Sequence, residues 1–157
     1  MIEQDTIKLL RECDAGVKMG VSSIDDVLDY VASKKLKERL EQCKAGHEAL
    51  GREIRQLLEA CHDAGKDPSP MASGMSWVKT SLKLAWNESD QTIAGLMTDG
   101  CGMGVKSLGR YLNQYKAASE EAKDITRRLY PWQHRHGSSL HPGGGYRPSP
   151  ACQSLRL

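Results

Sequence analysis

The chain of 157 residues lacks any apolar run that approaches the roughly 18 residues of a transmembrane helix. Its first five residues, MIEQD, do not have the character of a secretory signal. The formal net charge of +2 is too small to favour nucleic acid or an anionic membrane as a partner. We therefore expect a cytoplasmic protein without nucleic-acid or membrane partners, and one domain with a single substantial core.

The chain also lacks a Cys-x-x-Cys motif. Its five cysteines are odd in number and widely spaced, at positions 13, 43, 61, 101 and 152. That pattern is typical neither of a disulfide framework nor of a zinc finger. It favours reduced cysteines that act as small apolar residues of the core.

Prolines are rare between residues 1 and 130, where only Pro68 and Pro70 occur. Two segments before them carry apolar residues at alternating three- and four-residue steps, a pattern typical of long amphipathic helices. The pattern predicts helices over about 3–31 and 34–63, with Ser33 as an N-cap. Helices joined by so short a link must fold back as an antiparallel hairpin.

The rest of the chain predicts two further helices and a tail. An apolar stripe indicates a short helix over about 71–86, and Ser89 is the expected N-cap of a long helix over about 90–129. Residues 131–157 are rich in Gly, Pro and His and show no periodicity, which is typical of a disordered tail. We therefore expect an all-α protein: an antiparallel four-helix bundle over residues 1–130 with an irregular C-terminal tail.

The predicted helix over 90–129 is unusual in its glycines. Each glycine inside a helix costs about 1 kcal/mol relative to alanine, so the cluster should have a compensating role. Gly100 and Gly104 fall on one helix face, which favours close approach of a neighbouring helix. A local kink and the approach of a ligand are the alternatives. The glycines of this segment are Gly95, Gly100, Gly102, Gly104 and Gly109.

Two polar residues occupy positions in the apolar seams of the first two helices, Asp14 and His47. Ionisable groups in such a seam are costly unless they are paired, hydrogen-bonded or bound to metal. One interpretation is a buried Asp14–His47 pair that fixes the helix register. The other is a mononuclear metal site, because thiolate and imidazole ligands suit zinc. Its candidate ligands are Asp14, Cys43, His47 and Cys101.

Four stretches resemble a bacterial family of uncharacterised ferritin-like proteins: LLRECDAGVKMGV (9–21), GHEALGREI (46–54), PSPMASGMSW (68–77) and IAGLMTDGCGMGVKSL (93–108). The resemblance covers about residues 3–130. It implies a ferritin-like four-helix bundle and carries no agreed activity. Ferritin-like di-iron proteins place a Glu on each of two helices and a Glu-x-x-His motif on each of the other two.

This chain departs from the di-iron pattern. The single Glu-x-x-His motif, Glu59 to His62, lies off the apolar seam, and Lys44 stands three residues before His47. We therefore expect a non-catalytic, ferritin-like bundle without a cofactor, which assembles with itself or docks a protein partner. The alternative is a zinc- or iron-binding protein that uses the Cys, His and Asp residues of the core.

Overall fold

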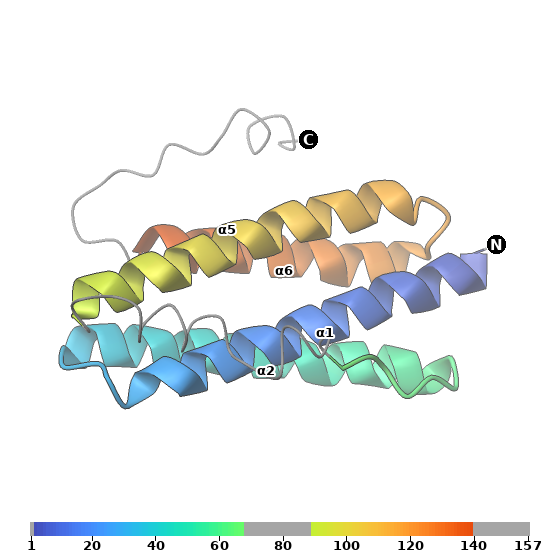
Figure 1. Cartoon of the computed structure of the whole chain (residues 1–157). Helices are drawn as coiled ribbons and strands as arrows, with labels where there is room; N and C mark the ends of the chain where they lie inside the picture. The colour runs from blue at the N-terminus through green and yellow to red at the C-terminus, as the bar shows by residue number, and fades with distance from the viewer. Residues whose placement is uncertain (1, 68–88, 140–157) are drawn as a thin grey trace.

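The structure is a computed structural model, and it describes residues 2–67 and 89–139. Within these ranges the chain forms helices and no strands. The helices are α1 (Ile2–Leu28), α2 (Lys34–Ala60), α5 (Asp90–Gln114) and α6 (Glu120–Ser139), which lie side by side as a bundle (Figure 1). The prediction of an all-α, bundled protein is confirmed at this level. None of the described helices is long and apolar enough to cross a membrane.

The link between α1 and α2 ends at Ser33, as the sequence predicts, but it begins earlier than predicted, because α1 ends at Leu28 and not near residue 31. Ser33 is the N-cap of α2, and its side chain accepts a hydrogen bond from the backbone N–H of Leu36 at 3.3 Å. Ser89 caps α5 in the same way through Thr92 N–H, also at 3.3 Å. The Asp90 carboxylate accepts from the backbone N–H groups of the α1–α2 link, from Ser33 at 2.7 Å for example. This contact fixes the start of α5 beside that link.

The prediction of one helix over 90–129 is wrong. The chain leaves α5 after Gln114, turns, and enters α6 at Glu120. Ser119 caps the new helix, because its hydroxyl accepts from Ala122 N–H at 3.2 Å. Two acidic residues follow in the first turn of α6, where the helix dipole favours negative charge. The alanines at 118 and 122 continue the helical spacing of apolar residues through the turn. For this reason the periodicity alone predicts one continuous helix.

Two further predictions concern the helix expected over 71–86 and the irregular tail expected from residue 131. The helix expected over 71–86 lies outside the described residues. Helix α6 continues through Ser139, so the irregular chain expected from residue 131 is not found over 131–139. The rest of the expected tail, 140–157, also lies outside the described residues.

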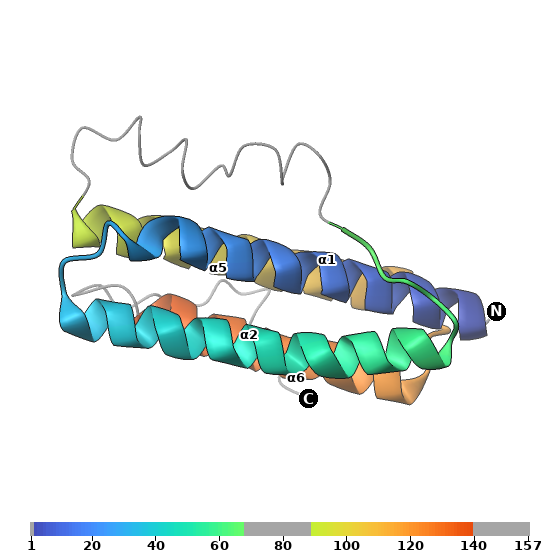
Figure 2. The same cartoon turned by 90° about the horizontal axis from the view of Figure 1, so that it is seen from below.

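Two helical hairpins make up the bundle. Helix α1 runs antiparallel to α2, and α5 runs antiparallel to α6 (Figure 1). Near the start of α1, Thr6 accepts a hydrogen bond from Ser119 N–H at 2.8 Å, so this end lies beside the α5–α6 turn. Because Asp90, at the start of α5, binds the link that follows the opposite end of α1, α1 is antiparallel to α5, and α2 runs in the same direction as α5. Figure 2 shows α1 lying over α5 and α2 lying over α6.

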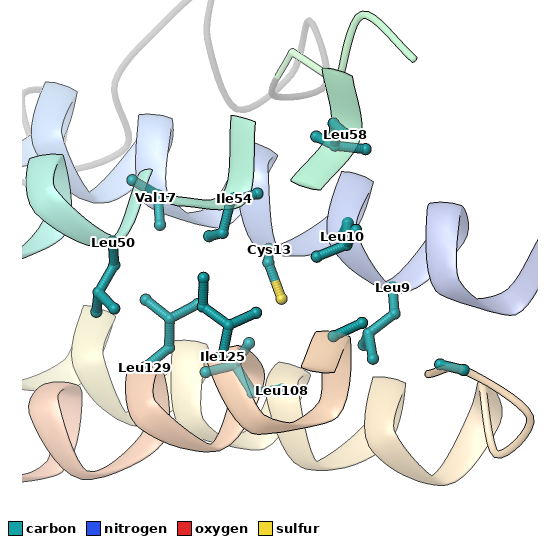
Figure 3. Packing of buried hydrophobic residues seen from close by; sticks show 12 residues of the cluster. Leu9, Leu10, Cys13, Val17, Leu50, Ile54, Leu58, Leu108, Ile125 and Leu129 are labelled. Atoms are coloured by element: carbon teal, nitrogen blue, oxygen red, sulfur yellow. The ribbon is translucent and has the colours of Figure 1, made fainter. Parts of the chain in front are cut away.

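The core has two sections along the bundle. One is formed by all four helices and includes Leu9, Leu10, Ile54, Ile125 and Leu129, whose side chains meet in Figure 3. The other gathers residues of α1, α2 and α5 at the opposite end: Ile24, Val27, Leu36, Leu40, Cys43, Ile93, Ala94 and Met97.

Candidate functional site: a cavity between α1 and α5

Asp14 is fully buried on α1 and faces the chain that follows α2. Its Oδ2 accepts from the backbone N–H of Lys66 at 3.1 Å and forms an ion pair with Lys18 Nζ at 2.9 Å. The hydrogen bond to Asp14 raises the pKa of Lys18. The other carboxylate oxygen, Oδ1, is buried and has no hydrogen-bond partner among the described residues. Asp14 thus fastens the chain after α2 against α1.

Gly65 makes this contact possible. Its φ of +83° lies in the left-handed region that favours glycine. A Cβ atom at this position would come within 2.5 Å of Asp14 Oδ2. Ion pairs on either side hold the same segment to α1, with Arg11 to Asp63 at 2.7 Å and Lys66 to Glu12 at 2.6 Å.

The predicted pairing of Asp14 with His47 is wrong. Both residues are buried, as expected, with 0 % and 3 % of their surface exposed. Across residues 2–67 and 89–139, however, no hydrogen bond or ion pair joins them. His47 Nδ1 instead lies 2.9 Å from the carbonyl oxygen of Cys43, one turn earlier on α2. A carbonyl only accepts, so Nδ1 carries the proton and donates it.

His47 packs against the backbone of α1 at Gly20. A Cβ on Gly20 would lie 3.0 Å from the ring atoms Cδ2 and Nε2, so a larger residue there would require the ring to shift by a few tenths of an ångström. Burial lowers the pKa of His47, although the hydrogen bond to Cys43 acts in the opposite direction. The ring is therefore neutral near pH 7.

The thiols of Cys13, Cys43 and Cys101 are neutral as well. Burial raises the pKa of Cys43 to about 12, with a smaller contribution from the neighbouring Cys101. Burial also raises the pKa of Cys13 and of Cys101 to about 11 each. The Cys43 Sγ lies 3.9 Å from His47 Nδ1. These thiols act as small, weakly polar groups rather than as thiolates.

A cavity of about 480 Å³ lies between α1 and α5. Cys43 and His47 of α2 line it, together with Cys101 of α5. Asp14 is not part of its wall, so the structure gathers three of the four predicted site residues and leaves the fourth apart. In the part of the chain that the structure describes, no three His, Cys, Asp or Glu side chains form a group that could hold a metal ion.

Small residues at matched spacing contribute to both long walls. Helix α1 contributes Gly16, Gly20 and Ser23, and α5 contributes Gly100, Gly104 and Ser107. The steps are four and then three residues in each helix, which keeps each set on one face. Gly100 and Gly104 therefore line a cavity between α1 and α5. The repeated spacing in α1 and α5 is the sequence signal that could have located it.

The two Glu-x-x-His residues have no part in this site. Glu59 and His62 are both exposed, and the chain at His62 adopts a positive φ of 56° just after α2 ends. The expectation that this motif lies off the seam is confirmed.

No protein-family model, curated protein or solved structure matches this chain.

Proposed function

We propose that this protein is a non-catalytic bundle of the ferritin-like type that binds an apolar ligand between α1 and α5. The ferritin-like assignment is supported by the helix directions. Because α2 and α5 run the same way, residues 61–89 have to connect opposite ends of the bundle. Ferritin-like bundles have one such long crossover connection. The resemblance in residues 9–21 and 93–108 points to the same class.

The observation that carries the binding function is the cavity. Its volume of about 480 Å³ falls in the range of small-molecule sites, which are mostly apolar and contain few polar groups. The described wall is largely aliphatic side chains, thioethers and neutral thiols, with the neutral ring of His47 among them. An apolar ligand would lose little hydration in entering and would leave no charge of the wall unpaired.

The state of the nucleophilic groups supports binding rather than catalysis. Attack by a thiol needs a thiolate, and the pKa values of Cys43 and Cys101 are raised to about 12 and 11. The Nδ1 proton of His47 is held by a backbone carbonyl instead of by a carboxylate. Cys43, His47 and Cys101 are therefore better suited to contact a bound ligand than to act as nucleophile, acid or base.

Metal binding is the second candidate, and one observation favours it. Cys43, His47 and Cys101 line the same cavity, and thiol and imidazole groups suit zinc. A structural zinc site has four ligands, and Asp14, the fourth predicted ligand, is bound to Lys18 and Lys66 elsewhere. Metal content per chain, measured after purification without chelator, tests this candidate. Stoichiometric zinc or iron that is lost in His47→Ala would replace our proposal.

Self-assembly or docking of a protein partner remains a prediction. Met19 and Met103 are 36 % and 51 % exposed and lie in the wall of the cavity, on α1 and α5. A second chain covering them would bury apolar surface. Light scattering on the purified protein gives the number of chains in the particle.

Xenon binding tests the proposed function directly, because apolar cavities that stay dry take up this gas. The measurement is the shift of methionine methyl resonances of ¹³C-methyl-labelled protein as xenon pressure rises. Met97 is 6 % exposed and lines the cavity, so its resonance should shift and saturate.

Two glycine variants, one in the cavity wall and one outside it, test whether the xenon response comes from the cavity. Gly16→Leu projects into open space from the cavity wall and should weaken the xenon response. Gly102→Leu, which lies outside the wall and also meets open space, should leave it intact. An unresponsive Met97 in a folded protein would overturn the proposal.

A further inference from the structure

The cavity is long and narrow. On α1 its wall extends from Glu12 to Ile24, which at about 1.5 Å per residue corresponds to about 18 Å. On α5 it extends from Leu96 to Tyr111, about 22 Å, so the shorter α1 wall sets the length over which both helices line the cavity. Dividing 480 Å³ by about 18 Å leaves a cross-section of about 27 Å². Apolar atoms in contact lie about 4 Å apart, so this passage has room for one hydrocarbon chain but not for two side by side.

The two ends of the cavity differ in polarity and exposure. At one end lie Ile24, Cys43 and Met97, whose exposed fractions are 1 %, 1 % and 6 %. At the other end lies the ion pair between Glu12 and Lys66, where 43 % of the Lys66 side chain is exposed. A ligand with one apolar end and one polar end would therefore have a preferred direction.

Methionine side chains make the wall adaptable. Met19 on α1 and Met103 on α5 are exposed, while Met97 is buried. Methionine is unbranched and flexible, and it is common on surfaces that accept ligands of varying shape. Such a wall selects a ligand by its length and apolarity rather than by polar contacts.

We infer that the cavity takes a single extended acyl chain, with its methyl end beside Ile24 and Met97 and its head group beside Lys66. This inference rests on the proposed function and names its ligand class. A C–C bond of about 1.5 Å with tetrahedral angles advances about 1.25 Å along an extended chain. A cavity of about 18 Å therefore holds about 14 carbons. Glu12 already neutralises Lys66, so the chain supplies most of the affinity and the head group little.

The test is a chain-length series. Dissociation constants are measured by calorimetry for saturated fatty acids of increasing length and for the matching alcohols, at concentrations where they are monomeric. Each added CH₂ should tighten binding about fourfold. The gain should level off near about 14 carbons, where the chain fills the cavity. The dissociation constants of a fatty acid and of the alcohol of the same length should agree within a few fold. A lysophospholipid, which carries one acyl chain, tests whether the chain can come from a membrane lipid instead of a free fatty acid.

Two serine variants locate the closed end. Ser23 lines the cavity and directly precedes Ile24 on α1, whereas Ser22 is exposed and outside the wall. Ser23→Leu should move the levelling-off point to shorter chains by about three carbons, because leucine adds carbons beyond Cβ that occupy space at the closed end. Ser22→Leu should leave the point unchanged. Helical circular dichroism and the melting temperature verify that both variants fold.

The outcomes separate this inference from the proposed function. A levelling-off point that Ser23→Leu shifts and Ser22→Leu does not would establish the acyl-chain site. If xenon shifts the Met97 resonance but no single-chain lipid binds, the assignment of an acyl chain is wrong and the apolar site stands. The same holds if affinity keeps rising with chain length and never levels off. If neither xenon nor lipid binds the folded protein, both are wrong.

Discussion

Lys66 donates its backbone N–H to the buried carboxylate of Asp14 at 3.1 Å, while its side chain binds Glu12, two residues earlier on α1, at 2.6 Å. The chain after α2 is thus attached to α1 at two neighbouring levels. Asp14 therefore links α1 to the chain that follows α2, and this contact does not involve His47.

Replacing Asp14 should destabilise the protein. Asp14→Ala removes the acceptor of Lys66 N–H and the partner of Lys18, and we expect a loss of about 1–3 kcal/mol in the free energy of unfolding. The value is moderate because Lys18 keeps Asp67 as a partner and 32 % of its side chain meets solvent. Urea denaturation measures the loss. Asp67→Asn is the control, since Asp67 is 90 % exposed and its pair should contribute less than about 1 kcal/mol.

Gly65 and Gly102 should respond in opposite ways to the same substitution. Gly65→Ala places a Cβ near Asp14 Oδ2 at a positive φ, so we expect a destabilisation of more than about 1 kcal/mol. Gly102→Ala adds a Cβ in open space inside α5, and it should stabilise by about 0.5–1 kcal/mol. Thermal melts of the two variants, run under one set of conditions, give both values. Equal signs would contradict the local geometry at Gly65.

A double-mutant cycle distinguishes the observed contacts from the Asp14–His47 pair that the seam pattern predicted. Within the described residues no hydrogen bond or ion pair joins Asp14 to His47, and the two bind different backbone groups, Lys66 N–H and Cys43 C=O. The losses of Asp14→Leu and His47→Leu should therefore add to within about 0.5 kcal/mol in the double variant. A double variant much less damaged than that sum would restore the pairing.

How far the sequence determined this structure differs from element to element. Helix periodicity and the serines at 33 and 89 located α1, α2 and the start of α5, because capping and amphipathicity are local properties. Periodicity also showed that Asp14 and His47 are buried. It could not identify their partners, since Lys66 lies 52 residues from Asp14 in the chain. The break before α6 was missed because alanine spacing continued through it, although Ser119 and the acids after it marked a new helix start.

The thiols should react in an order set by burial. Cys13 and Cys43 are each 1 % exposed and have pKa values raised to about 11 and 12, so alkylation at pH 8 should reach them only after unfolding. Cys61 is half-buried and should be modified in the native protein. Mass spectrometry of peptides after timed treatment with iodoacetamide gives the order. Rapid native labelling of Cys43 would mean that the cavity wall opens far more often than this packing allows.

Stability should fall as the pH drops below about 6.5, with His47 as the cause. Burial lowers the pKa of His47 from its ordinary 6.5, so the unfolded chain binds a proton more readily than the folded protein does. Stability is therefore fully present above pH 6.5 and decreases as the pH falls toward the lowered value, since protonation favours the unfolded state. Urea titrations between pH 7 and pH 5 measure this slope. His47→Leu should flatten it, whereas His62→Gln, at an exposed position, should leave it unchanged. A slope that survives in His47→Leu would assign the effect to another group and would mean that the buried ring is not held neutral.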